Sequence, residues 1–240
     1  MLLRNRWNGA YQTLVNRYVA LTEFAANRLI AGGLPSARVV VKPNFMADIP
    51  SPGGGNGGYV VYVGRLSAEK GVRTLLSAWK FLPGVPLKIL GDGPLRQELE
   101  RFSATDNLPV EFLGFCDHKR IAEVVGGAAF QIVPSEWYEG FPMVIVEAYA
   151  YGTPVIASRI GSLDEIVEEG VTGVKFEPGN PRDLSDKVKA LWTDPLRQST
   201  LRRTARERFD MKFSSKKNFE ALMEIYKAAI MDHAKTKGDR

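Results

Sequence analysis

The chain has 240 residues, 45% hydrophobic and 25% charged, which is the composition of an ordinary globular protein. No apolar run reaches the roughly 18 residues that a membrane-spanning helix needs, and arginines interrupt the first residues where a signal peptide requires an apolar core. A cytoplasmic protein is therefore expected. The single cysteine, Cys116, has no partner for an internal disulfide, which fits a reducing compartment.

The net charge of +5 is concentrated in the last part of the chain. Residues 196–240 contain 12 Lys and Arg against 6 Asp and Glu, so residues 1–195 together carry a charge of about −1. Helical runs such as LRRTARERF usually carry such charge as a solvated face. The alternative is a basic surface attracted to anionic lipid, at the periphery of a membrane. The sequence has no zinc-ligand spacing and no aromatic residues interleaved on basic strands, so nucleic-acid binding is not expected.

The first part of the chain predicts a helix, a strand, a second helix and a second strand. Apolar residues at helical spacing predict an amphipathic helix over residues 5–17. A short strand from Tyr18 to Leu21 precedes a helix for which Thr22 is a suitable N-cap, and which ends at the pair Gly32 and Gly33. The run RVVVKPN, residues 38–44, is the second strand.

The stretch ADIPSPGGGNGG, residues 47–58, is rich in Gly, Pro and Ser and has no core-forming side chain beyond Ile49. Such a composition is typical of a linker, and it places a domain boundary here. The sequence therefore predicts a first unit over residues 1–46, a principal domain over residues 59–212, and a terminal helix with a basic tail over residues 213–240.

Beyond the linker, a pattern of strand, turn and helix repeats. Near-continuous apolar strands that alternate with helices predict a parallel sheet covered on both faces, which is a doubly wound, Rossmann-like α/β fold. Ligands of such sheets bind beyond the carboxyl ends of the strands, so the loops after the strands form the candidate site. The predicted strands are YVVYVG, PLKILG, VEFLG, AFQIVP and TPVIAS, and the predicted helices lie near residues 70–81, 94–102 and 118–126, from residue 142, and near 163–168.

The first of these loops, GRLSAEKG, contains a glycine and two cations. Gly64 lets the backbone approach a ligand closely, and Arg65 and Lys70 lie five residues apart. Both cations suit an anionic ligand. The alternative is an Arg and a Lys that are simply exposed on a turn into a helix.

The fourth loop, SEWYEGFP, ends where a helix is predicted to start. Pro142 suits the first helical position, which leaves the N–H groups near Met143 and Val144 without a partner in the helix. Such a helix start binds phosphate through its unpaired donors and its partial positive charge. If the first and fourth loops lie at the same sheet edge, Arg65, Lys70 and this helix start converge on one anion, and a diphosphate would fit them.

Two motifs for other ligands are incomplete. The run GDGPLR, residues 91–96, has Arg96 where the dinucleotide fingerprint has its third glycine, so an NAD site is rejected. No two aspartates are separated by one residue, so the Asp-x-Asp arrangement that commonly holds a metal against a nucleotide diphosphate is missing. The charge on a phosphate leaving group must then be balanced by Arg65, Lys70 and the helix dipole, without a metal or another cofactor.

Two glutamates flank the same helix start. Glu139 lies in the loop, and Glu147, eight positions later, interrupts the otherwise apolar run MVIVEA. A carboxylate among apolar side chains needs hydrogen-bond donors or a cation. An ion pair of Glu147 with an Arg or Lys, and a loop or capping role for Glu139, are the purely structural interpretations.

The motifs GRLSAEKG, GDGPLR, FLGF, PSEWYEGFPMVIVEA, GTPVIAS and EEGVTG follow one another in the chain. In this order they resemble the nucleotide-binding half of the retaining glycosyltransferases of family 4, also called group 1, which have the GT-B fold. The resemblance covers about residues 18–230. It implies the transfer of a sugar from a nucleotide diphosphate donor to an acceptor, with retention at the anomeric carbon and without a metal.

The resemblance also implies roles for individual residues. It places Glu139 on the hydroxyls of the donor sugar and Glu147 on the ribose hydroxyls of the nucleotide, whose diol supplies two donors to a carboxylate. It matches Arg65 and Lys70 with the diphosphate-binding cations and the backbone of residues 113–115 with the base pocket. The candidate catalytic residues are therefore Glu139, Arg65 and Lys70. The candidate donor-binding residues are Gly64, Arg65, Lys70, Gly91, Leu113, Gly114, Glu139, Gly140, Phe141, Pro142, Met143, Val144 and Glu147.

The sequence departs from the family in its amino-terminal part. GT-B enzymes have two Rossmann-like domains, and the amino-terminal one supplies the acceptor site, whereas residues 1–46 match only its last helix, strand and helix. The chain therefore resembles half an enzyme, which is either truncated or works with a separate acceptor-binding chain. The acceptor, a sugar or a lipid-linked sugar, is not predicted. The strand from Tyr18 to Leu21 would have no sheet of its own to join, which predicts either self-association of the chain or a mobile stretch of its first 46 residues.

Two rival functions follow from the same residues. One is a non-catalytic module that binds a nucleotide sugar, and the other is a sugar-nucleotide epimerase that shares the GT-B architecture. The two glutamates eight positions apart and the paired Arg65 and Lys70 favour the transferase. Neither histidine, His118 or His233, is placed like a general base, and both are expected at the surface.

Overall fold

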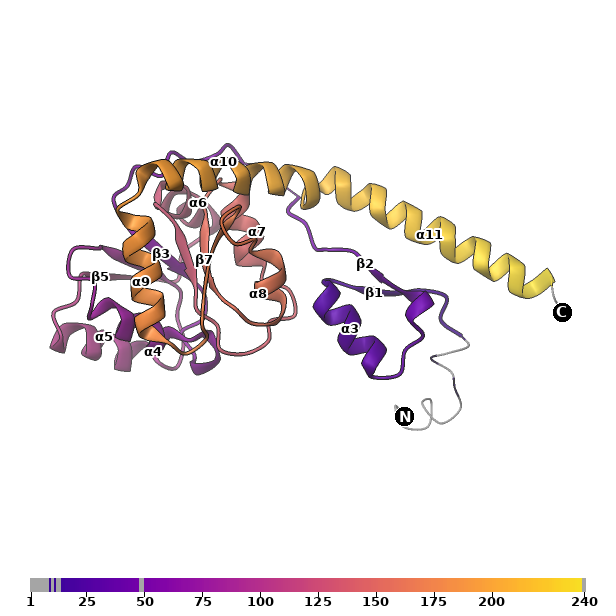
Figure 1. Cartoon of the computed structure of the whole chain (residues 1–240), viewed down its shortest axis with the longest axis horizontal. Coiled ribbons are helices and arrows are strands. Elements are labelled where there is room, and N and C mark those ends of the chain that lie inside the picture. Colours follow the sequence, from indigo (N-terminus) through magenta and orange to yellow (C-terminus); the bar gives the residue numbers. More distant parts are fainter. Residues whose placement is uncertain (1–8, 10, 12–13, 48–49, 239–240) are drawn as a thin grey trace.

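The computed structural model describes residues 9, 11, 14–47 and 50–238, with side chains described as far as residue 234. Of the helix predicted over residues 5–17, positions 5–8, 10, 12 and 13 lie outside the described residues, and residues 14–17 are described and not helical, so the predicted end of this helix is wrong. The described chain forms three parts, a small βαβ unit, a principal domain around one sheet, and a long C-terminal helix that runs from the domain along the small unit (Figure 1).

The principal domain is built on a six-stranded parallel sheet in the order β5-β4-β3-β6-β7-β8. The chain moves outward from β3 in one direction, then returns to pair β6 with β3 and moves outward in the other. This reversal of strand order is the feature that opens a ligand crevice in doubly wound sheets. The strands are β3 (Val60–Val63), β4 (Leu87–Leu90), β5 (Val110–Gly114), β6 (Gln131–Val133), β7 (Val155–Ser158) and β8 (Gly173–Phe176). The predicted doubly wound, Rossmann-like sheet is therefore confirmed.

Helices cover both faces of this sheet. Successive residues of a strand point to opposite faces, so Val60 and Tyr62 of β3 enter one core cluster and Val61 enters the other. The first cluster is completed by α4 (Val72–Trp79), α5 (Arg96–Thr105) and α9 (Pro181–Trp192). The second is completed by α6 (His118–Gly127), α7 (Met143–Ala150), α8 (Gly161–Ile166) and α10 (Pro195–Lys212).

The amino-terminal unit contains a sheet of its own. Strand β1 (Tyr18–Ala20) pairs in parallel with β2 (Val39–Val41), and α3 (Glu23–Ala31) with a short 3₁₀ turn, η1 (Ser36–Arg38), connects them. The expectation that the first strand has no sheet to join is therefore wrong, because the run RVVVKPN returns alongside it. The predicted cap is confirmed, since the Thr22 side chain accepts a hydrogen bond from the Ala25 N–H at 3.0 Å.

The Gly- and Pro-rich segment, residues 50–58, lies against the principal domain. The Gly53 N–H donates to the Tyr151 carbonyl at 2.9 Å, and the Gly53 carbonyl accepts from Arg202 of α10 at 3.3 Å. A Cβ on Gly53 would lie 2.2 Å from the Gly126 carbonyl oxygen, so only glycine allows this approach. The glycines that suggest a linker in the sequence therefore also allow this segment to pack closely against the backbone of the domain.

Helix α11 (Ser215–Gly238) joins the two units. The Asn218 side chain donates to the Pro43 carbonyl at 2.8 Å, and Arg17 forms an ion pair with Asp232 at 2.5 Å. Several large apolar side chains of this helix are exposed, and the self-association they suggest stays a prediction. They are Phe219, Met223, Tyr226, Ile230 and Met231.

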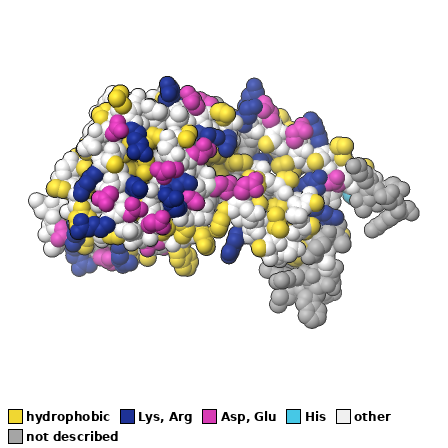
Figure 2. Space-filling model, in the orientation of Figure 1, with side chains coloured by type: hydrophobic (Ala, Val, Ile, Leu, Met, Phe, Trp, Pro, Cys, Tyr) yellow, Lys and Arg dark blue, Asp and Glu magenta, His cyan; other side chains and the backbone are white. Residues whose placement is uncertain are grey.

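The charged side chains of the surface are mixed in sign. Lys and Arg alternate with Asp and Glu over the face of the molecule in Figure 2, and α11 carries neighbouring pairs such as Lys217 with Glu220 at 2.9 Å. This arrangement is typical of a solvated charged face. Within the described part of the chain, no helix is both long enough and apolar enough to cross a membrane.

Candidate functional site

The loops after β3, β4 and β5 are hydrogen-bonded to one another at the carboxyl edge of the sheet. The Gly64 N–H donates to the Leu90 carbonyl at 3.0 Å, and the Gly91 N–H donates to the Gly114 carbonyl at 2.7 Å. Gly91 has a φ of +133°, and a Cβ at this position would lie 1.9 Å from the Gly64 carbonyl oxygen. A glycine is required there, so the predicted glycines form the floor that holds three loops together.

A cavity of about 300 Å³ opens above this floor, and most of its walls are apolar. It is lined by Val63, Gly64, Arg65, Leu90, Gly91, Asp92, Phe115, Cys116 and Ile121. The Cys116 Sγ lies 3.9 Å and 3.7 Å from the carbonyl oxygens of Leu113 and Gly114, so these two predicted residues form the strand end behind the cavity. Sequence reasoning missed three residues of the cavity wall: Asp92 of the loop after β4, Cys116 of the loop after β5 and Ile121 of α6.

The loops after β3 and β6 also meet, which confirms the expectation that they share one sheet edge. The Glu136 N–H donates to the Glu69 carbonyl at 3.0 Å. Gly71 has a φ of +66°, and a Cβ there would lie 1.8 Å from the Pro134 carbonyl oxygen. The second close approach again depends on a glycine, and it fixes the position of Lys70 one residue earlier.

Lys70 and Glu139 form an ion pair across these two loops. The Lys70 Nζ lies 2.5 Å from the Glu139 Oε1, and the two side chains are 31% and 19% exposed. The Ser135 hydroxyl donates to the same carboxylate oxygen at 2.7 Å, and the Ser162 hydroxyl donates to the Glu139 backbone carbonyl at 2.6 Å. The sequence assigned Lys70 and Glu139 to different parts of a ligand, whereas the fold brings them into direct contact.

Arg65 belongs to the same loop as Lys70. Its side chain is exposed and lines the cavity, and no carboxylate within the described residues lies at ion-pair distance from it. Its backbone carbonyl accepts a hydrogen bond from the Tyr62 hydroxyl at 2.9 Å. Burial, with smaller contributions from Glu139 and Glu69, raises the pKa of Tyr62, so this phenol stays neutral and serves as a fixed donor beneath the loop.

The start of α7 differs by one residue from the prediction. Pro142 has a φ of −78° and a ψ of 90°, so it is the N-cap and Met143 is the first helical residue. The Ile145 N–H donates to the Pro142 carbonyl at 3.0 Å, and the described residues supply no acceptor to the N–H groups of Met143 and Val144. The predicted free donors are therefore present. No side chain caps this helix, so a capping role for Glu139 is wrong.

The residues between Glu139 and the helix complete the loop. Gly140 is exposed, and Phe141 is half-buried with its ring 6.2 Å from that of Phe213 at the end of α10. This aromatic contact anchors the loop to the helix layer behind it. Gly140 has no neighbouring atom within 4 Å of a Cβ position, so it lies open at the sheet edge.

Glu147 lies in the second turn of α7 and is half-buried. Burial raises its pKa above the ordinary value of 4.5, and His118 at the start of α6 acts in the opposite direction. No Arg or Lys of the described chain lies at ion-pair distance from it, so the expected alternative of such a pair is wrong. His118 is exposed, as expected, but its nearness to Glu147 was not predicted.

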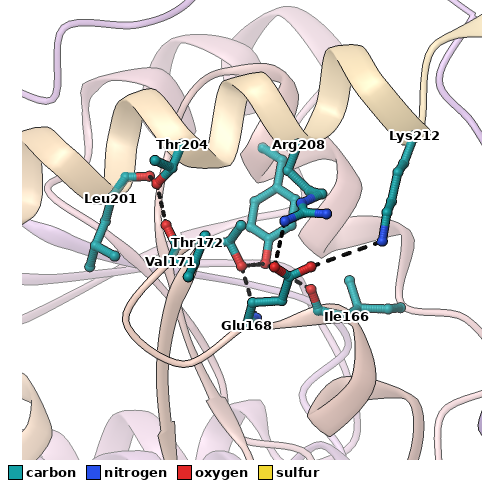
Figure 3. A network of polar contacts seen from close by, with 9 residues as sticks. Ile166, Glu168, Val171, Thr172, Leu201, Thr204, Arg208 and Lys212 are labelled. Atoms are coloured by element: carbon teal, nitrogen blue, oxygen red, sulfur yellow. Dashed lines mark hydrogen bonds and ion pairs between the residues drawn. The ribbon is translucent and has the colours of Figure 1, made fainter.

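The motif EEGVTG has a structural role. The Glu168 carboxylate pairs with Arg208 and, at 4.0 Å, with Lys212, two residues that reach it from α10 (Figure 3). The Thr172 hydroxyl accepts from the Glu168 N–H at 3.0 Å and from the buried Tyr149 hydroxyl at 2.7 Å. These contacts fix the turn between α8 and β8 beneath α10.

A metal centre has no support among the side chains described. No three His, Cys, Asp or Glu side chains of the described residues are grouped closely enough to hold a metal ion. Metal independence stays a prediction, to be tested by binding.

The fold and the loop arrangement define the class of protein. The six-stranded parallel sheet with its flanking helices is the Rossmann-like domain of GT-B proteins, as comparison with solved structures shows. The chain superimposes on the Anabaena protein HepE, solved in complex with UDP, with a TM-score of 0.82 at 23% identity, over 89% of this chain and 64% of that one. For sucrose-phosphate synthase of Thermosynechococcus elongatus the TM-score is 0.81 at 25% identity, over 97% of this chain and 63% of that one.

The family follows from the sequence comparison. The family model for glycosyl transferases group 1 matches residues 49–208, so the chain belongs to that family. An uncharacterised glycosyltransferase of Methanocaldococcus jannaschii is 31% identical over 94% of this chain, and a glycogen synthase of Mycobacterium tuberculosis is 34% identical over 71%. The chain spans 65% of the length of the first relative, and the match with the second covers 42% of that protein.

Proposed function

We propose that this chain is the donor-binding part of a retaining glycosyltransferase that uses a nucleotide diphosphate sugar without a metal. The observation that carries the proposal is the contact between Lys70 and Glu139, at 2.5 Å, in the loop that leads directly to the free N–H groups at the start of α7. Cations and helix donors for a diphosphate therefore lie next to a carboxylate that can accept from sugar hydroxyls.

Each part of the donor has a proposed partner. The diphosphate takes Arg65, Lys70 and the N–H groups of Met143 and Val144. The sugar hydroxyls donate to Glu139, and the ribose hydroxyls donate to Glu147, whose half-buried carboxylate has no cation beside it. The base enters the cavity behind Arg65. Solved relatives in complex with UDP and with UDP-glucose support a nucleotide sugar as the ligand.

The same groups serve the transfer step. When the bond between the anomeric carbon and the phosphate oxygen breaks, negative charge develops on the departing diphosphate. Arg65, Lys70 and the start of α7 stabilise that charge, and Lys70, paired with Glu139, and the helix start are already held in place before the reaction begins. The acceptor, a sugar or a lipid-linked sugar, binds to a second domain. That domain belongs to a longer form of the chain or to a separate partner, in line with the 65% of the relative's length that this chain spans.

Calorimetric titration with UDP, GDP, ADP and their glucose or mannose derivatives in EDTA tests the binding. We expect the nucleotides of one base to bind. Arg65→Ala should lower their affinity at least tenfold, which corresponds to about 1.4 kcal/mol. Arg73→Ala is the matched control, because Arg73 of the neighbouring helix α4 is exposed and paired with Glu98 at 2.6 Å. Binding that disappears in EDTA and returns with magnesium would contradict metal independence.

The stereochemistry needs a separate measurement. Slow hydrolysis of the bound donor, followed by proton NMR, reports the anomer that forms first, and we expect the anomer of the donor. The opposite anomer would contradict retention. Inversion at C2 of the sugar would identify an epimerase, and tight binding without any turnover, even with the acceptor domain present, would identify a non-catalytic module.

A further inference from the structure

The start of α3 is docked on the principal domain by a single carboxylate. Glu165 of α8 accepts hydrogen bonds from the N–H groups of Glu23 and Phe24 at 2.9 Å and 2.8 Å. The next two N–H groups of the helix are satisfied by Thr22, through its side chain and its carbonyl. The first turn of α3 is therefore held at a fixed place against α8, with its positive end toward a negative charge.

This docking places the Phe24 ring against the loop that carries Glu139. The rings of Phe24 and Tyr138 lie 4.9 Å apart and are tilted by 41°, and the Arg28 guanidinium lies 5.9 Å from the Tyr138 ring. A Cβ on Gly161 would lie 2.7 Å from Tyr138 and 3.3 Å from Phe24, so both rings rest on the start of α8. Tyr138 is 61% exposed, and this aromatic contact holds it on one side only.

Glu139 follows Tyr138 directly, and its own contacts come from three elements. Ser162 of α8 holds its carbonyl, while Lys70 and Ser135 hold its carboxylate. Tyr138 is joined directly to Glu139. A change in the position of Tyr138 therefore disturbs Glu139, whose backbone carbonyl and carboxylate are both held by these contacts. Helix α3 belongs to the amino-terminal unit, so this unit contacts Tyr138, the residue before Glu139, through the Phe24 ring and the Arg28 guanidinium.

We propose that α3 positions Glu139 for the donor sugar, because Phe24, docked by Glu165, holds Tyr138 and with it the adjoining carboxylate. Phe24 and Glu165 are positioning residues that touch no part of the ligand. The inference rests on the proposed function, in which Glu139 binds the sugar and other residues bind the nucleotide. Its consequence is specific: the amino-terminal unit affects recognition of the sugar and leaves recognition of the nucleotide unchanged.

The test compares the affinities of UDP and UDP-glucose by calorimetry. If guanine or adenine nucleotides bind the wild type more tightly, GDP or ADP and its sugar derivative replace them. In Phe24→Ala, the affinity of the sugar nucleotide relative to the nucleotide should fall by about 2- to 10-fold, the range measured for aromatic pairs. The affinity for the nucleotide alone should be unchanged. Leu29→Ala is the matched control, because Leu29 lies on the same helix and is 38% exposed.

A double-mutant cycle separates positioning from a general loss of structure. If Phe24 acts through Tyr138, the double variant Phe24→Ala with Tyr138→Ala should match Tyr138→Ala alone. Glu165→Ala should lower the same ratio, and Glu165→Gln, which keeps one acceptor oxygen, should restore part of it. Additive losses, or equal losses of both ligands, would overturn the inference.

Hydrogen exchange of residues 135–142 gives a readout that needs no ligand. Exchange should be faster in Phe24→Ala than in Leu29→Ala, because the loop loses one of its supports. Unchanged exchange would overturn the inference even if binding changed. If the wild type binds no nucleotide, the proposed function fails and the inference fails with it, whereas normal binding with an unchanged affinity ratio in Phe24→Ala overturns the inference alone.

Discussion

Replacing Glu147 with Gln is expected to weaken nucleotide binding and to stabilise the folded protein. The side chain is half-buried, burial raises its pKa above 4.5, and no Arg or Lys of the described chain pairs with it. A carboxylate in this position costs free energy unless a ligand supplies donors. The ribose diol of a nucleotide supplies two, so the same charge that destabilises the ligand-free protein favours the bound state.

The size of the binding loss follows from the hydrogen bonds involved. A bond to a charged acceptor contributes about 1.5–3 kcal/mol, so the loss of the charge should weaken a ribonucleotide by about 10- to 150-fold. A 2′-deoxyribonucleotide has one hydroxyl fewer at this position. Its affinity should therefore fall less in the variant than that of the ribonucleotide.

The stability change has a definite sign and pH range. Because the folded-state pKa of Glu147 is raised, its protonated form is favoured by folding, and that contribution is complete below about pH 4.5 and lost as the pH rises through the folded-state pKa. At pH 7 the wild type therefore carries the cost of the buried charge, and Glu147→Gln should unfold at higher urea. This advantage should shrink as the pH falls toward 4.5.

Calorimetry with UDP and 2′-deoxy-UDP, together with urea unfolding at pH 7 and pH 5, measures both effects. Glu207→Gln is the control, because the Glu207 side chain on α10 is 60% exposed. A variant that is less stable than the wild type at pH 7 and loses equal affinity for both nucleotides would refute the reasoning. That result would mean that a cation pairs with Glu147 in solution.

Three other substitutions test separate parts of the structure. Lys70→Met leaves the Glu139 carboxylate without its cation, so urea unfolding should show a loss of about 1–3 kcal/mol, and an unchanged midpoint would contradict the ion pair. Arg202→Met removes donors from the carbonyls of Gly53 and Ala128, so proteolysis of residues 50–58 should accelerate, and equal cleavage rates would show that the segment is held by other contacts. Ile230→Lys on α11 should reduce concentration-dependent sedimentation of the chain, and a wild type that stays monomeric at every concentration would contradict self-association.

The main elements could be predicted because their signals are local. Apolar runs predicted five strands of the domain, and a side-chain cap marked the start of α3, where Thr22 accepts a hydrogen bond from the Ala25 N–H at 3.0 Å. The sixth strand, β8, was not predicted. Its first residue is Gly173, where a Cβ would lie 1.9 Å from the Val155 carbonyl oxygen, and Lys175 interrupts the apolar run. Close packing against β7 requires a glycine at this position, and a glycine in place of an apolar residue shortens the apolar run by which a strand is predicted.

The candidate site could be predicted only loop by loop. The glycines, the cations and Glu139 lie in loops that follow strands, as expected of ligand loops in a parallel sheet, whereas Glu147 lies in the second turn of α7. The pairing of Lys70 with Glu139, separated by 69 positions, depends on β6 lying beside β3, and strand order leaves no local pattern in the sequence. For the same reason the contact of Phe24 with Tyr138 was not foreseen.

The ion pair explains how a carboxylate and a diphosphate can share one small site. Two like charges at close range oppose binding unless a cation lies between them. A lysine ammonium carries three donors, and only one of those of Lys70 is used by Glu139 at 2.5 Å, so the same group can also donate to a phosphate oxygen. In the proposed function, Lys70 can therefore stay paired with Glu139 when the donor binds. The pair would then align the two ends of the donor, with phosphate on the cation and sugar hydroxyls on the carboxylate.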